Sequence, residues 1–115
     1  MAFLSRLASG LVVAAAVSLF GGAVQAQEAT SVQIVIKDHR FSPSEVKVPA
    51  GKPITIRVDN QDATPEEFES KTLRIEKIIP GKSSGTFNVR ALQPGRYKFF
   101  GEFNEATAQG VLVVE

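Results

Sequence analysis

Glutamate side chains at alternate positions are the feature of this sequence best suited to chemistry. Glu67 and Glu69 are two residues apart, so in an extended segment they lie on one face while Phe68 points to the other. Phe68 is then expected in a hydrophobic core, which leaves the two carboxylates directed outward. Glu102 and Asn104 repeat the same spacing later in the chain. If such oxygen donors converge, they suit hard or borderline cations such as Fe³⁺, Fe²⁺ and Mn²⁺.

The composition excludes most other kinds of site. The 115-residue chain has no cysteine, and its one methionine is Met1, so thiolate zinc sites, iron–sulfur clusters, thiol nucleophiles and cysteine-ligated copper are ruled out. A formal charge of +1, from 13 basic and 12 acidic side chains, provides no basic surface for nucleic acid. No nucleophile–base pair, phosphate-binding loop or two-histidine helix motif is visible, so hydrolytic or group-transfer catalysis has no support.

Residues 1–26 are predicted to be a secretory signal peptide. Arg6 supplies the positive start, an apolar stretch follows, and the small residues Val24 and Ala26 occupy positions −3 and −1 before the cleavage site. The alternative is a membrane anchor that is retained, although the span over 7–24 is short for that role and contains Gly and Ser. Cleavage removes one charged side chain, Arg6, which leaves 12 basic and 12 acidic residues. We therefore expect a periplasmic domain without net charge over 27–115.

The segment 27–115 is predicted to form one all-β domain. Apolar residues recur at every second position over 32–36 and 54–58, which is typical of strands with one buried face. Closely spaced turn signals separate such runs, among them the Pro-Gly pairs at 80–81 and 94–95. No window shows a convincing helical period. The pattern predicts a Greek-key antiparallel β-sandwich of about 7–8 strands.

The order and spacing of these strands and turns resemble a cupredoxin domain. The first half of that domain is similar to Phe41-x-Pro-x-x-Val-x-Val-x-x-Gly51 followed by Ile54-x-Ile-x-Val-x-Asn60. Its last two strands are similar to Leu92-x-Pro-Gly-x-Tyr-x-Phe99 and Gly110-Val-x-Val113. The resemblance covers nearly all of 27–115 and implies a cupredoxin-like sandwich.

Cupredoxins hold copper at one pole of the sandwich, and the ligands of their electron-transfer members are absent here. The resemblance places the first ligand position within Glu66–Ser70. Gly101 stands about where the cysteine would be, Asn104 where the second histidine would be, and Ala108 or Gln109 where the methionine would be. A blue-copper electron carrier requires the thiolate, so that function is excluded.

A narrower resemblance is to the EfeO-type cupredoxin-like proteins of bacterial periplasms. It is carried by Asp59-Asn-Gln-Asp-Ala-Thr-Pro-Glu-Glu-Phe-Glu-Ser70 and by Gly101-Glu-Phe-Asn-Glu105. It implies an accessory protein of ferrous or ferric iron uptake that binds iron, copper or both and works with an inner-membrane iron permease or a periplasmic iron-binding partner. Contact with the membrane is then made through that partner. A variant in which the protein oxidises Fe²⁺ is also implied, although no copper ligand set supports it.

The predicted metal ligands are the residues that a cupredoxin topology brings to one pole: Glu67, Glu69, Glu102, Asn104, Glu105 and His39. Asp62 and Glu66 are weaker candidates. Crowding of like charges at the pole is expected to raise some carboxyl pKa values until a cation or a basic partner neutralises them. The opposing interpretation is that these are solvated acidic loops and a surface histidine.

A second functional interpretation is a metal-free β-sandwich that docks to another exported protein. Lys71, Arg74 and Lys77 alternate with apolar residues and form either a solvated strand face or a docking stripe for an acidic partner. This interpretation predicts that changes to the acidic pole are tolerated.

Overall fold

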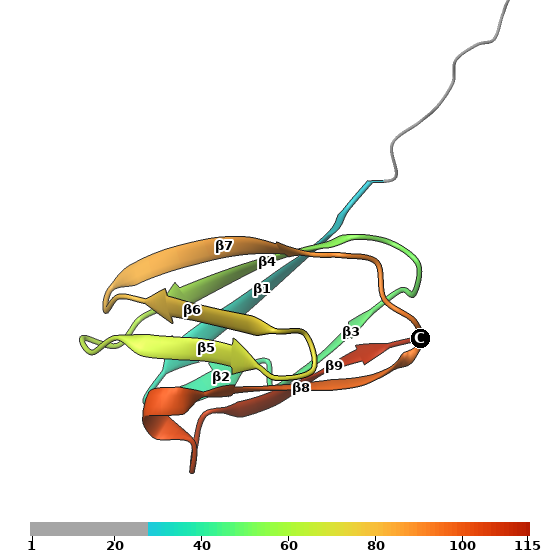
Figure 1. Cartoon of the computed structure of the whole chain (residues 1–115). Helices are drawn as coiled ribbons and strands as arrows, with labels where there is room; N and C mark the ends of the chain where they lie inside the picture. The colour runs from blue at the N-terminus through green and yellow to red at the C-terminus, as the bar shows by residue number, and fades with distance from the viewer. Residues whose placement is uncertain (1–27) are drawn as a thin grey trace, which may run out of the picture.

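Two β-sheets packed face to face make up the computed structural model, which describes residues 28–115 (Figure 1). Sheet A has the strand order β2-β1-β4-β7 and sheet B the order β3-β9-β8-β5-β6. The elements along the chain are β1 (Thr30–Lys37), β2 (Arg40–Ser42), β3 (Glu45–Val48), β4 (Ile54–Asn60), β5 (Glu66–Ser70), β6 (Ile75–Ile79), β7 (Ser83–Val89), β8 (Gly95–Gly101), the 3₁₀ turn η1 (Glu102–Asn104) and β9 (Gln109–Val114). The prediction of an all-β sandwich is confirmed.

The sandwich differs from the predicted one in strand number and in the direction of two strand pairs. The described residues form nine strands, because the three-residue β2 is too short to show an alternating pattern in the sequence. The pairs β1–β4 and β3–β9 are parallel, whereas the other pairs are antiparallel. Parallel neighbours arise because the chain crosses from one sheet to the other between β2 and β3, so strands distant in sequence become adjacent.

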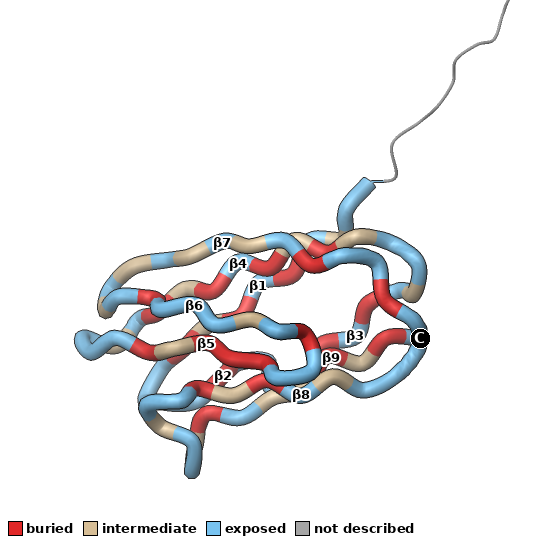
Figure 2. The backbone as a smooth tube through the Cα atoms, in the orientation of Figure 1, coloured by how far each residue is buried: buried red, intermediate tan, exposed pale blue. Residues whose placement is uncertain are grey.

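Alternating burial along the strands builds the core between the two sheets, as the red and pale blue segments of Figure 2 show. Strands β1 and β4 contribute aliphatic side chains, and three phenylalanines from different strands meet at the centre. Phe68 lies with its ring centroid 4.9 Å from that of Phe99 and 5.7 Å from that of Phe41. Phe68 is 1% exposed, which confirms that it points into the core and that Glu67 points away from it.

The predicted signal peptide, 1–26, lies outside the described residues, so its cleavage and the export of the domain stay predictions. Over 28–115, no helix is long and apolar enough to cross a membrane.

Candidate metal centre

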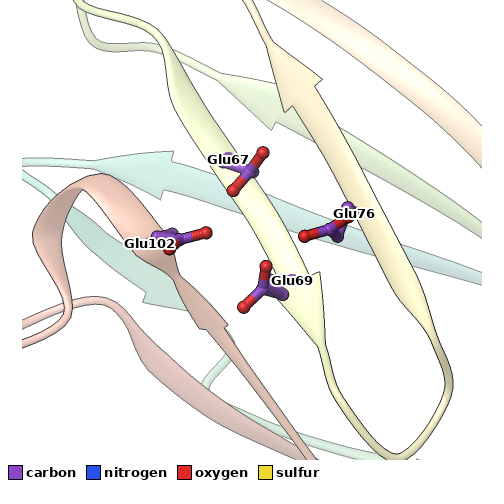
Figure 3. Close-up of side chains that lie close together, drawn as sticks. All are labelled: Glu67, Glu69, Glu76 and Glu102. Carbon is purple, nitrogen blue, oxygen red and sulfur yellow. The ribbon is translucent and has the colours of Figure 1, made fainter.

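Four glutamate side chains meet on the outer face of sheet B. Glu67 and Glu69 come from β5, Glu76 from β6 and Glu102 from η1, and their carboxylates point toward one another (Figure 3). One oxygen from each of the four lies within 4.8 Å of the oxygens of the other three. Among residues 28–115 this is the one group of three or more His, Asp or Glu side chains that comes so close together. We call it the glutamate cluster.

The strand register explains why these four residues converge. In the β5–β6 hairpin Glu69 lies directly opposite Glu76, so both side chains point to the same face of the sheet. On the other side of β5, Phe68 is paired with Gly101, and Glu102 follows Gly101 directly, which brings it beside Glu67. Since Phe68 points into the core, its neighbours in β5 point outward, and the cluster lies on the solvent side.

A buried carboxylate, that of Glu66, holds η1 in place. Glu66 is 1% exposed, and its Oε1 accepts hydrogen bonds from the backbone N–H groups of Phe103 (2.9 Å) and Glu67 (3.0 Å). Its Oε2 accepts a hydrogen bond of 2.7 Å from the Asn104 amide. A buried acceptor with three donors is well satisfied, and it ties the turn that carries Glu102 to the start of β5.

Gly101 leaves the room that the Glu66 carboxylate occupies. A Cβ atom built on Gly101 would lie 2.5 Å from Cδ of Glu66 and 2.8 Å from Cβ of Ala108, distances at which atoms clash. Any residue larger than glycine at this position would therefore displace Glu66 and the turn that it holds.

The β5–β6 hairpin is anchored at its open end by Asn60, the last residue of β4. The Asn60 side chain is buried and donates hydrogen bonds to the carbonyl oxygens of Thr64 (2.9 Å) and Ile79 (3.1 Å). These bonds join the end of sheet A to the residues just before β5 and to the last residue of β6. The two strands that carry three of the four glutamates are thus held at the same end as η1.

Mutual repulsion and burial perturb the titration of the cluster. A hydrogen bond with Glu102 and burial raise the pKa of Glu67 from 4.5 to about 6. Burial, followed by hydrogen bonds with Glu76 and Glu102, raises the pKa of Glu69 from 4.5 to about 7. Hydrogen bonds from Glu67 and Glu69 lower the pKa of Glu102. Glu102 therefore carries the negative charge, and the protons of Glu67 and Glu69 are donated to it. The expected upward shift of crowded carboxyl groups is present in Glu67 and Glu69.

The remaining predicted ligands lie elsewhere at the same end of the sandwich. The side chain of Asn104 is used as a donor to Glu66, and Glu105 is exposed, with its backbone oxygen accepting a hydrogen bond from the Gln109 amide. His39 places its Nε2 3.4 Å from Oγ1 of Thr64. The structure therefore brings Glu67, Glu69 and Glu102 together and leaves Glu105, His39 and Glu66 outside the cluster, whereas the Asn104 amide is bonded to Glu66.

Asp62, a weaker candidate ligand, joins two loops. Its carboxylate accepts hydrogen bonds from the backbone N–H groups of Asp38 (2.8 Å) and His39 (2.9 Å), two residues with φ of 53° and 58°. The hydrogen bond from His39 is the main cause that lowers the pKa of Asp62. This contact fixes the turn between β1 and β2 against the loop that follows β4.

Sequence reasoning missed Glu76, and the missing information was the register of the hairpin. The residues between β5 and β6, Lys71–Arg74, form a short turn, and a hairpin closed by it pairs Glu69 with Glu76. The sequence pattern predicts that Lys71, Arg74 and Lys77 lie on one strand, as a solvated face or as a docking stripe. In the structure Lys71 and Arg74 lie in the turn, and Lys77 is paired with the inward-facing Phe68. The position of the turn at 71–74 is the signal that identifies Glu76 as the fourth carboxylate.

A groove of ≈ 500 Å³ adjoins the glutamate cluster. It is lined by Glu69, Ser70, Lys71, Arg74, Ile75 and Glu76. Two residues of the cluster thus line an open volume that two basic residues also line. The groove gives a small ligand access to one flank of the cluster.

Comparison with known proteins gives the class to which this fold belongs. A family model described as a cupredoxin-like domain matches residues 10–114, and the chain is a member of that family. The uncharacterized protein RP394 of Rickettsia prowazekii (strain Madrid E) is 45% identical to it over 83 residues, which cover 72% of this chain and 66% of that protein. The chain thus spans 66% of the length of this relative.

Solved structures of similar fold include a blue copper protein, a purple cupredoxin and a domain of a copper exporter. Auracyanin A, a "blue" copper protein of Chloroflexus aurantiacus, is similar at a TM-score of 0.65 and 16% identity, covering 76% of this chain and 100% of that one. A purple cupredoxin of Nitrosopumilus maritimus is similar at 0.55 and 19% identity, covering 73% and 99%. The metal-binding domain of the Cu(I)-exporting ATPase CopA of Streptococcus pneumoniae is similar at 0.63 and 15% identity, covering 74% and 84%. At these identities the similarity establishes the fold alone.

The residues present do not fit a copper site built on a cysteine thiolate. The chain has no cysteine, and its one methionine is Met1. The space beside Gly101 that a larger side chain would need is filled by the Glu66 carboxylate, and Asn104 is bonded to that same carboxylate. A hydrogen-bonded pair of polar side chains therefore occupies this end of the sandwich.

Removal of the Glu66 carboxylate should loosen η1. We expect Glu66→Ala to lower the free energy of unfolding by about 1–3 kcal/mol, because the N–H of Phe103 and the amide of Asn104 lose their acceptor. Urea unfolding measures the loss, and hydrogen exchange of the Phe103 amide locates it. The exposed Glu105→Ala is the matched control and should change stability by less than about 0.5 kcal/mol. An unchanged exchange rate at Phe103 in Glu66→Ala would contradict this role.

The metal-free protein should lose stability as the pH rises from about 4.5 to about 7. Native Glu67 and Glu69 retain protons in this range that the unfolded chain has released, because their native pKa values are about 6 and about 7 against the usual 4.5. The stabilisation is complete below the unfolded pKa and is lost as the pH passes the native values. Thermal unfolding of Glu67→Gln/Glu69→Gln should show a higher Tm than wild type at pH 7.5 and a flatter pH profile. Glu28→Gln/Glu105→Gln, which makes the same charge change elsewhere, should follow wild type. A Tm of wild type that climbs over this pH range would refute the assignment.

Proposed function

We propose that this cupredoxin-like domain binds a hard metal ion, iron in the first place, through Glu67, Glu69, Glu76 and Glu102. The observation that carries the proposal is the convergence of four carboxylates whose ligand oxygens lie within 4.8 Å of one another. Each of the four residues can offer one oxygen to a single ion, as a coordination shell of carboxylates requires. We further propose that the domain serves as a periplasmic accessory protein of iron uptake.

The burial of Glu69 supports a cation at this position. Glu69 is 7% exposed although it lies on the outer face, and its carboxylate lies among those of Glu67, Glu76 and Glu102. Over 28–115 the one salt bridge is between Arg96 and Glu45, so no basic side chain forms a salt bridge with the cluster. Buried carboxylates are normally paired with a cation or coordinate a metal. A bound ion would supply positive charge in direct contact with these carboxylates.

The donor set favours a hard ion over the copper of the family's electron carriers. Carboxylate oxygens prefer Fe³⁺, Mn²⁺ and similar ions, whereas copper sites with redox roles depend on thiolate, thioether and imidazole ligands. Cu²⁺ nevertheless binds more tightly than the other divalent ions to most nitrogen and oxygen sites. Binding of Cu²⁺ in vitro would therefore not by itself identify copper as the physiological ion. We propose binding and transfer of the ion as the role of the site, and not catalysis.

The metal site is tested by titration of residues 27–115 with Fe²⁺, Fe³⁺, Mn²⁺ and Cu²⁺. We expect Glu67→Gln/Glu69→Gln/Glu102→Gln to weaken Fe³⁺ and Mn²⁺ binding by more than about 100-fold, because it removes three ligands that Gln replaces only poorly. Glu28→Gln/Glu105→Gln/Glu115→Gln carries the same charge change at exposed positions outside the cluster and should bind as wild type does. Affinity of the wild type should also rise between pH 5.5 and 7.5, because the ion displaces the protons of Glu67 and Glu69. Equal binding by the two triple variants would eliminate the metal site.

A second candidate function, docking to another exported protein without a metal, has one observation in its favour. Ile78 and Phe103 are 55% and 52% exposed, and both border the glutamate cluster. Ile78 lies directly opposite Glu67 in the hairpin, and Phe103 follows Glu102. Exposed apolar side chains of this size are typical of contact surfaces for a partner. In an iron-uptake role that partner would be an inner-membrane iron permease or a periplasmic iron-binding protein.

Iron accumulation in a strain that lacks this gene separates the two candidates. If the protein delivers iron, the glutamine triple variant of the cluster should fail to restore ⁵⁵Fe uptake, whereas the exposed triple variant should restore it fully. If the domain only docks, the cluster variant should restore uptake and Ile78→Ser/Phe103→Ser should not. Uptake that is the same with and without the gene would exclude a role in iron acquisition for either candidate.

A further inference from the structure

The groove beside the glutamate cluster carries both signs of charge, and this combination is informative about the ligand. Glu69 and Glu76 line one side, and Lys71 and Arg74, from the turn between β5 and β6, line the same volume of ≈ 500 Å³. A site for a bare cation needs only the carboxylates. Basic residues this close would weaken the binding of a bare ion through repulsion.

The two basic side chains do not neutralise the carboxylates that they face. Among residues 28–115 no Lys or Arg forms an ion pair with Glu69 or Glu76, since the one salt bridge there joins Arg96 and Glu45. The Lys71 ammonium instead lies 5.9 Å from the centroid of the Phe100 ring, and Phe100 is opposite Glu69 in the sheet. Both Lys71 and Arg74 are exposed, so their charges are available to a ligand in the groove.

The net charge of the site distinguishes divalent from trivalent ions. With all four glutamates ionised, the cluster carries four negative charges, and Lys71 and Arg74 contribute two positive ones. A divalent ion would then bring the site to zero. A trivalent ion would leave one positive charge, which a single monovalent anion cancels.

The number of ligands that the ion requires also points to a bound anion. Hard cations of this kind take about six oxygen ligands, and four glutamates binding through one oxygen each fill four of these positions. The groove adjoins Glu69 and Glu76, so a small ligand in it can reach an ion held by these two residues. A small carboxylate in the groove can supply one further oxygen to the ion, and a guanidinium is well suited to hold its other oxygen.

Resting on the metal site proposed above, we propose that the domain binds a trivalent hard cation together with one small carboxylate anion, which lies in the groove and contacts Lys71 and Arg74. The physiological ligand is then a ferric carboxylate chelate and not a bare ion. A divalent ion binds to the same cluster without the anion.

The test measures Tb³⁺ binding with and without glycolate, because Tb³⁺ is a trivalent, oxygen-seeking ion whose emission lifetime reports how many waters it retains. Glycolate should lower the Kd of wild type for Tb³⁺ about tenfold, the effect of one charge-assisted hydrogen bond, and should lengthen the emission lifetime. Sodium perchlorate at equal ionic strength should do neither. The Kd for Mn²⁺ should not change with glycolate.

Two charge-matched variants decide whether Lys71 and Arg74 are responsible. Lys71→Gln/Arg74→Gln should bind Tb³⁺ alone at least as tightly as wild type, because repulsion is removed, but should lose the gain from glycolate. Lys47→Gln/Lys52→Gln changes one exposed residue of β3, at the opposite edge of sheet B from β6, and one in the turn that follows β3, and it should keep that gain. A glycolate effect that persists in Lys71→Gln/Arg74→Gln, or that is absent from wild type, overturns the co-ligand while leaving the metal site intact. If wild type does not bind Tb³⁺ or Mn²⁺ at all, the metal site itself fails and the co-ligand with it.

Discussion

The contact on which the site depends most is the buried carboxylate of Glu66 beside Gly101. Three donors, two backbone N–H groups and the Asn104 amide, converge on it and fix the turn η1 against the start of β5. Glu102 belongs to that turn, so its position next to Glu67 is a consequence of this buried contact. The glycine is required because any Cβ atom there would collide with the carboxylate. Buried hydrogen bonds thus position a cluster that itself lies at the surface.

The glutamate cluster in turn places like charges where the sheet alone would tolerate few of them. Cross-strand neighbours that carry the same charge destabilise a sheet, and here Glu69 faces Glu76 directly. A hydrogen bond with Glu102 raises the pKa of Glu67 to about 6 and burial raises that of Glu69 to about 7, so protonation of these two groups limits the repulsion. A site of this kind is less stable empty than filled at neutral pH, and a cation that binds to it stabilises the fold. The same four crowded carboxylates thus lower the stability of the empty protein and provide the ligands for a cation.

The sequence was sufficient for the fold class and for part of the site. Alternation along β1 and β4 predicted the strands, and the position of Phe68 correctly placed Glu67 and Glu69 on the outer face. The parallel pairs and the short strand β2 were not predictable from local pattern, because pairing between distant strands leaves no trace in the alternation of either one. Glu76 was missed because its place depends on hairpin register. Asn104 was predicted as a ligand, but the sequence alone did not reveal that a buried Glu66 would engage it.

The most direct test of the account is a crystal structure of residues 27–115 grown with Mn²⁺, with the ion located by its anomalous scattering. The account predicts one strong peak among Glu67, Glu69, Glu76 and Glu102, at about 2.0–2.3 Å from an oxygen of each carboxylate, with Glu66 still bonded to η1. A peak at His39 or Glu105, or no peak on this face at an Mn²⁺ concentration that saturates binding in solution, would contradict it.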